Sequence, residues 1–162
     1  VGTGYGRVQV PLANKEITEI SCHALGTNHL YGPSVRTLLD MGGQDLKVIS
    51  VDEQGKVQTF LMNDKCAAGA GRGMETMADL LSVPIEEVGN FALNFEGELP
   101  PMSSECVVFA KNDAMRRVKE GWPKDKHPGE PTVARRARRV YDLLVRVGIQ
   151  REFAITGGIA KN

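Results

Sequence analysis

The clearest structural pattern in the chain lies in residues 35–62, VRTLLDMGGQDLKVISVDEQGKVQTFLM, where three apolar runs are separated by two short turns. We predict strands over residues 35–41, 46–51 and 57–62, because each run is largely apolar and is bounded by residues that favour turns. Strands that follow one another through tight turns pair side by side, so these three are expected to form an antiparallel meander.

Helical patterns around this meander indicate an α/β fold. Apolar residues recur at helical spacing over 17–31, 68–81, 111–119 and 132–147, and a last strand is predicted over 153–156. The remaining expectations are a strand end over 7–10, a loop over 90–102 and a short buried segment over 107–110.

The composition argues against a nucleic-acid-binding, a membrane-spanning or a disulfide-rich protein. Twenty Lys and Arg residues balance twenty Asp and Glu residues among 162, so the net charge favours neither a nucleic acid nor an anionic membrane as partner. No apolar run approaches the roughly 20 residues of a membrane span, and no signal peptide is recognised, so we expect a cytoplasmic protein. Three widely spaced cysteines are not a disulfide framework. Both ends look cut, which suggests an internal fragment.

The turn Gly42-Gly43-Gln44-Asp45 is a candidate nucleotide site. Glycines let backbone N–H groups approach a phosphate closely. The carboxylate of Asp45 is suited to hold Mg2+, directly or through water, and Gln44 is suited to orient a water, which makes these two the candidate catalytic residues. The alternative is an ordinary hairpin turn, in which Gly and Asp are common.

A second candidate site follows the strand at 153–156. There Gly157 and Gly158 lead into a helix start, a geometry common at nucleotide contacts, although a plain strand-to-helix turn has the same sequence. The two glycine turns together favour nucleotide binding more than either does alone, because two lobes can clamp one nucleotide.

Cys66 begins a small-residue loop that leads into the helix expected over 68–81. A thiolate there faces the unpaired N–H groups of a helix N-terminus, which suits an anionic iron–sulfur cluster. The alternative is an inert buried thiol. Cys106 lies 40 residues further on, and the two cannot complete a four-thiolate site alone. If both are ligands, a partner subunit supplies the others and the cluster lies on a dimer axis.

Two other features are expected to have structural roles. Cys22 and His23 share a predicted helix with His29, but the spacing does not give one helical face. The arginines within 135–139 are expected to face solvent or another lobe rather than a nucleic acid.

Five motifs occur in the order found in one family. The chain resembles the ATP-dependent electron activators, which comprise the nucleotide-binding subunits of benzoyl-CoA reductase and the activators of 2-hydroxyacyl-CoA dehydratases. The motifs are GYGR at 4–7, EISCHA at 19–24, DMGGQD at 40–45, NDKCAAGAGR at 63–72 and TGGIAKN at 156–162.

The resemblance implies an actin-like, sugar-kinase-like fold with two ribonuclease-H-like lobes, incomplete at both ends of this sequence. Residues 1–35 would end the first lobe, and residues 36–162 would form most of the second. One 4Fe-4S cluster would be shared between two subunits, with Cys66 and Cys106 as this chain's ligands. ATP would contact Gly42, Gly43, Gln44, Asp45, Gly157 and Gly158.

The implied activity joins ATP hydrolysis to electron transfer. A reduced ferredoxin-like donor would charge the cluster, and ATP-driven lobe motion would send the electron to a separate, acyl-CoA-binding catalytic subunit. The leading hypothesis is reductive dearomatisation of benzoyl-CoA, which residues 31–37 and 74–77 favour. The alternatives are activation of a 2-hydroxyacyl-CoA dehydratase, and a non-redox actin-like or sugar-kinase-like nucleotide-binding module. The homologous subunit across the cluster would complete a homodimer or a heterodimer.

Two departures from the family pattern are notable. The family's glycine-rich phosphate loop and a catalytic acidic residue precede the region matched here, so this segment alone is not expected to hydrolyse ATP. Residues 122–137 hold three prolines within nine residues where the family has a helix. Either a loop replaces that helix or, as we hypothesise, the coding sequence carries a local double frameshift. Resequencing the source gene tests the frameshift hypothesis. Clean reads that encode these prolines in related copies of the gene would contradict it.

Overall fold

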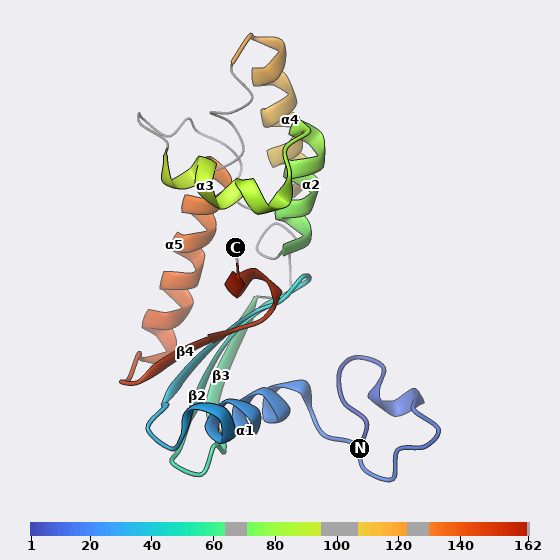
Figure 1. Ribbon diagram of the computed structural model, residues 1–162, viewed down its shortest axis with the longest axis vertical. Coiled ribbons are helices and arrows are strands. Elements are labelled where there is room, and N and C mark those ends of the chain that lie inside the picture. Colours follow the sequence, from blue (N-terminus) through green and yellow to red (C-terminus); the bar gives the residue numbers. More distant parts are fainter. Residues whose placement is uncertain (64–70, 95–106, 123–129, 162) are drawn as a thin grey trace. The chain divides into compact units, whose positions relative to one another are not determined.

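A four-stranded sheet contains the predicted meander (Figure 1). The computed structural model describes residues 1–63, 71–94, 107–122 and 130–161. Its α-helices, strands and 3-10 helices (η) are η1 (Arg7–Gln9), α1 (Glu19–Tyr31), β1 (Thr37–Met41), β2 (Leu46–Val51), β3 (Val57–Asn63), α2 (Gly71–Leu81), η3 (Ile85–Glu87), α3 (Val88–Leu93), α4 (Val107–Lys119), α5 (Glu130–Val147), β4 (Phe153–Thr156) and η5 (Gly158–Lys161).

The strand order is β3-β2-β1-β4. β1, β2 and β3 follow one another through short turns and are neighbours in the sheet, which confirms the predicted meander. β4 pairs in parallel with β1, in a register that places Thr37 opposite Phe153 and Asp40 opposite Thr156. The chain therefore leaves one edge of the sheet after β3 and returns along the other edge.

The chain divides into two compact units. They are residues 1–40, 47–61 and 144–156 for the first, and residues 41–46, 62–143 and 157–162 for the second. The lobe boundary expected near residue 35 stays a prediction.

The first unit is built on the sheet. α1 lies along one face of it (Figure 1), where Ala24 packs against Leu38 and Ile49. β1 and β2 are buried along almost their whole length, whereas the edge strands β3 and β4 are more exposed. α1 ends as expected at Gly32, whose φ is +90° and whose N–H donates to the carbonyl oxygen of Asn28.

The core of the second unit is formed mainly by α2. Met74 and Ala78 pack with Val88 of α3, and Met77 packs with Ala114 of α4. These α2 residues lie on the apolar face that the helical spacing predicts over 71–81, while residues 64–70 lie outside the described residues.

Three local expectations are wrong. Residues 7–9 form η1 rather than a strand end, because the amides of Arg7 and Gln9 bond to the nearby carbonyls of Gly4 and Gly6. α3 occupies the start of the segment expected as a loop over 90–102. The segment 107–110 opens α4 and is not buried there, since Phe109 is 62% exposed.

Candidate functional site

The turn between β1 and β2 is closed by a hydrogen bond from the N–H of Gly42 to the carbonyl oxygen of Asp45 (3.0 Å). A Cβ on Gly42 would lie 3.3 Å from a carboxylate oxygen of Asp45, whose side chain is buried. Gly43 and Gln44 are exposed. The turn therefore offers the backbone of Gly43 and the side chain of Gln44 to a ligand and keeps the carboxylate beside Gly42.

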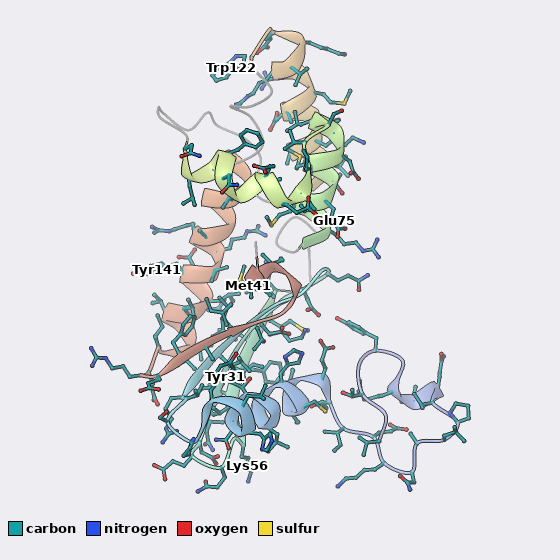
Figure 2. The ribbon with its side chains drawn as sticks, viewed as in Figure 1. Tyr31, Met41, Lys56, Glu75, Trp122 and Tyr141 are labelled. Carbon is teal, nitrogen blue, oxygen red and sulfur yellow. The ribbon has the colours of Figure 1, made fainter. Side chains whose placement is uncertain are left out.

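The second glycine turn lies directly against the first. Gly157 has a φ of +95°, and a Cβ there would lie 2.3 Å from the carbonyl oxygen of Met41. Met41 is labelled in Figure 2, at the carboxyl end of β1. No residue with a side chain fits this approach without displacing the backbone. The fold thus brings together the predicted nucleotide contacts, which are Gly42, Gly43, Gln44, Asp45, Gly157 and Gly158.

The start of α2 is bonded to the first turn. The N–H of Gly71 donates to the carbonyl oxygen of Gly42 (3.0 Å), and the N–H of Arg72 donates to that of Gly43 (2.7 Å). The contact is close, because a Cβ on Gly71 would lie 3.3 Å from both the Cα of Gly43 and the side chain of Ile159. Two amides that lack partners within their own helix are satisfied by the peptide groups of the turn.

A buried polar network in the first unit was not foreseen. Asp40 and Lys47 are 2% and 3% exposed, and the Nζ of Lys47 lies 3.5 Å from Oδ2 of Asp40 and 3.3 Å from Oε1 of Glu19. Oδ1 of Asp40 accepts a hydrogen bond from Thr156 (3.3 Å) and lies 3.7 Å from Nδ1 of His23. The sequence does contain a signal for this network, because Asp40 and Lys47 each lie inside an apolar strand. A charged side chain that is buried in this way needs a partner.

The same network resembles a cation site in one respect. Glu19, His23 and Asp40 place ligand-type atoms within 4.8 Å of one another. The ammonium of Lys47 already lies within ion-pair distance of two of these three side chains and supplies the positive charge. We therefore interpret the cluster as an internal ion-pair network.

The predicted cluster ligands Cys66 and Cys106 lie outside the described residues, so their role stays a prediction. Cys22 is a free, half-buried thiol within α1, in keeping with a structural role. In the described parts of the chain, no helix combines the length and the apolar character needed to cross a membrane.

Known proteins match this chain along its length. The model described as the BadF/BadG/BcrA/BcrD ATPase family matches residues 1–162. The 2-hydroxyisocaproyl-CoA dehydratase activator of Clostridioides difficile is 42% identical over 163 residues, covering 100% of this chain and 60% of the relative. The (R)-2-hydroxyglutaryl-CoA dehydratase activating ATPase of Acidaminococcus fermentans is 40% identical over 164 residues, covering 100% and 61%.

A solved structure of a dehydratase activator is also similar to this chain. The activator of the 2-hydroxyisocaproyl-CoA dehydratase from Clostridium difficile, with bound ADPNP, has a TM-score of 0.86 at 41% identity and covers 99% of this chain and 59% of its own. The expected α/β fold of the actin-like, sugar-kinase-like activator ATPases is confirmed. The chain spans about 60% of the length of these two dehydratase activators.

The dehydratase activators and the benzoyl-CoA reductase subunit are not equally similar to this chain. A benzoyl-CoA reductase subunit of Thauera aromatica is 35% identical over 103 residues, which is 63% of this chain and 36% of that protein. The dehydratase activators match over the whole chain at higher identity. The comparisons therefore favour the dehydratase activators, which were the alternative in the sequence-based hypothesis, over benzoyl-CoA reductase.

Proposed function

Because this chain belongs to the BadF/BadG/BcrA/BcrD ATPase family, we propose that it acts as an ATP-hydrolysing activator that supplies low-potential electrons to a 2-hydroxyacyl-CoA dehydratase. The contact of the two glycine turns, with α2 bonded to the first of them, is the observation that carries this proposal. The dehydratase activators among the relatives support the branch, and ADPNP in the C. difficile activator supports the nucleotide.

The first turn is suited to the phosphates of ATP. Gly43 is exposed, and a Cβ built on it would have nothing within 4 Å, so a phosphate can approach its backbone N–H. In this proposal Gln44 orients the attacking water, and Asp45 holds Mg2+ directly or through water. Gly157 and Gly158 contact the nucleotide from the adjoining turn.

The electron carrier in this proposal is a 4Fe-4S cluster. Such clusters are held by four cysteine thiolates. Cys66 and Cys106 would provide two, and a homologous partner subunit would provide the rest. The third cysteine, Cys22, lies within α1 and is not part of this donor set. When bound, the cluster would accept an electron from a reduced ferredoxin-like donor and release it to the dehydratase component.

The nucleotide and the cysteines are linked through the start of α2. Cys66 precedes Gly71 by five residues in the sequence, and Gly71 and Arg72 are bonded to the carbonyls of Gly42 and Gly43. If a bound nucleotide reorients the peptide groups of Gly42 and Gly43, the carbonyl oxygens that accept hydrogen bonds from Gly71 and Arg72 move as well. ATP binding and hydrolysis are therefore expected to alter the segment that holds Cys66.

Two other functions are also candidates. A benzoyl-CoA reductase component is the second candidate, favoured by the match to the reductase subunit of Thauera aromatica. Affinity isolation from the native host separates these branches, since a heteromeric complex indicates the reductase and a homodimer indicates the activator. A non-redox nucleotide-binding module is the third, and it requires no iron.

The test begins with protein purified anaerobically from its host. Iron analysis, an electron paramagnetic resonance (EPR) spectrum after reduction and calorimetric titration with Mg-ADPNP are measured first. Stimulation of a 2-hydroxyacyl-CoA dehydratase is then assayed with ATP and reduced ferredoxin. Iron, nucleotide binding and ATP-dependent stimulation are expected together. Absence of iron rules out an electron activator, and a loaded protein that stimulates benzoyl-CoA reduction instead would overturn the proposed branch.

A further inference from the structure

Asp40 and Thr156 occupy equivalent places in the sheet. They are register partners at the carboxyl ends of the parallel strands β1 and β4. Asp40 is followed by Met41 and the first glycine turn, and Thr156 is followed at once by Gly157. Ligands of α/β sheets bind beyond the carboxyl ends of parallel strands. The side chains of this pair therefore lie where the two candidate nucleotide turns leave the sheet.

A direct hydrogen bond joins the two side chains. The hydroxyl of Thr156 donates to Oδ1 of Asp40 at 3.3 Å, and it lies 3.4 Å from Nδ1 of His23. Backbone pairing aligns the two strands, but the side-chain bond adds a link at their last paired position. At 3.3 Å the bond is longer than the usual O–H···O distance of about 2.5–3.0 Å, so it aligns the two side chains without being a strong bond.

Lys47, which is also paired with Glu19, contacts the carboxylate of Asp40 through its second oxygen. Lys47 contacts Oδ2 of Asp40 at 3.5 Å and Oε1 of Glu19 at 3.3 Å, and its side chain is only 4% exposed. The carboxylate of Asp40 thus has contacts from α1, β2 and β4 at once. A buried ion pair is a poor source of stability compared with an apolar cluster of the same volume. We therefore interpret the ion pair of Lys47 with Asp40 as a contact that fixes the orientation of the Asp40 side chain.

We propose that Thr156 is a positioning residue for the nucleotide, which acts by holding Asp40 and so fixing the spacing at which the two glycine turns leave the sheet. This inference rests on the proposed function, because it assumes that both turns contact the nucleotide. It assigns a role to a hydroxyl that does not itself need to touch the ligand. The buried network then sets affinity for the nucleotide rather than merely supporting the fold.

The chain offers a matched control on the same strand pair. Thr37, at the opposite end of β1, is fully buried, and its hydroxyl donates to the carbonyl oxygen of Gln150 (3.1 Å) and accepts from the N–H of that residue (2.9 Å). Thr37→Val removes two hydroxyl contacts in the first unit, as Thr156→Val does. Thr37 bonds backbone groups far along the strands from the glycine turns, whereas Thr156 bonds side chains beside them, so Thr37→Val reports the effect of a lost hydroxyl on stability alone.

The experiment compares Thr156→Val, Thr156→Ser and Thr37→Val in the protein as its host produces it. Calorimetry gives the Kd for Mg-ADPNP, and thermal unfolding without nucleotide gives the Tm. We expect Thr156→Val to raise the Kd by about fivefold, because Asp40 loses one of the contacts that orient its side chain. Thr156→Ser should restore the wild-type Kd within about twofold. Thr37→Val should lower the Tm and leave the Kd unchanged. If Thr156→Val does not fold, Thr156→Ala replaces it with the same expectation.

Two negative results are distinguishable. If the unsubstituted protein binds Mg-ADPNP and Thr156→Val binds it equally well, the positioning role is overturned and the proposed function stands. If the unsubstituted protein does not bind Mg-ADPNP, the proposed function fails, and the positioning role fails with it. Equal losses of affinity in Thr156→Val and Thr37→Val would also overturn the inference, because the effect would then be one of general stability.

Discussion

The backbone N–H of Gly71 donates to the carbonyl oxygen of Gly42 at 3.0 Å, so the first amide of α2 is bonded to the turn that we assign to the phosphates of ATP. In a trans peptide the C=O and the following N–H point in opposite directions. The peptide unit that accepts from Gly71 therefore directs the N–H of Gly43 the other way. One rigid unit is thus shared between α2 and the exposed part of the turn.

Hydrogen exchange tests the neighbouring bond, from the N–H of Arg72 to the carbonyl oxygen of Gly43. Arg72→Pro removes the N–H that donates to Gly43 (2.7 Å), and proline is tolerated in the first turn of a helix. Arg72→Ala is the control, because it removes the exposed side chain and keeps the amide. We expect Mg-ADPNP to slow amide exchange in the peptide containing α2 for Arg72→Ala, but to have little effect for Arg72→Pro. Equal protection in both variants would show that the turn does not transmit the nucleotide state through this amide.

Gly157 and Gly158 provide a matched pair of substitutions. A Cβ on Gly157 would lie 2.3 Å from the Met41 carbonyl oxygen at a φ of +95°, whereas Gly158 has nothing within 4 Å. Gly157→Ala should lower the free energy of unfolding by at least about 2 kcal/mol and abolish ADPNP binding. Gly158→Ala should leave the stability almost unchanged. Urea denaturation with calorimetry checks both, and similar stabilities for the two variants would argue against the close approach of the turns.

Gln44 and Asp45 are expected to affect different steps. Gln44→Ala should reduce the kcat for ATP hydrolysis by about 100-fold with little change in the Kd for Mg-ADPNP, because an exposed residue that orients water acts mainly on the chemical step. Asp45→Asn should raise the Mg2+ concentration needed for half-maximal activity, since it loses the charge that attracts the ion. Steady-state ATPase assays at varied Mg2+ distinguish the two. An unchanged Mg2+ dependence in Asp45→Asn would remove this residue from the metal site.

The three cysteines are expected to divide into ligands and a structural thiol. Cys66→Ala and Cys106→Ala should each abolish iron binding, because the remaining thiolates cannot complete the cluster, and ADPNP binding should persist. Cys22→Ala, which changes a half-buried residue of α1, should retain full iron content. Iron analysis and calorimetry on anaerobically purified variants provide the measurement. Full iron content in Cys66→Ala would contradict the ligand assignment.

The local part of the fold follows from the sequence, and the non-local part does not. The meander over 35–62 is predictable because its apolar runs and turn residues are contiguous. The apolar run at 107–110 is ambiguous, because an exposed helix start and a buried strand have similar composition. The pairing of β1 with β4 joins residues more than a hundred positions apart, and no local periodicity encodes it.

The candidate site divides in the same way. The glycine turns could be located individually, because paired glycines between apolar runs mark turns, but the sequence of each turn fits an ordinary turn as well as a nucleotide site. Their contact through Gly157 and Met41 depends on the parallel strand pair. The network of Asp40, Lys47 and Thr156 depends on it too, because its members come from three strands. Sequence therefore indicates which residues carry the chemistry, and tertiary structure indicates which residues hold them in place.

The nucleotide is proposed to act on the cluster through the bond between the N–H of Arg72 in α2 and the carbonyl oxygen of Gly43. The most direct test is the EPR spectrum of the reduced protein recorded with and without Mg-ADPNP. The measurement compares Arg72→Ala with Arg72→Pro, both purified anaerobically. We expect a cluster signal in both variants, with a nucleotide-dependent change of that signal in Arg72→Ala alone. A spectrum without a cluster signal, or a signal that Mg-ADPNP changes equally in both variants, would contradict the proposal.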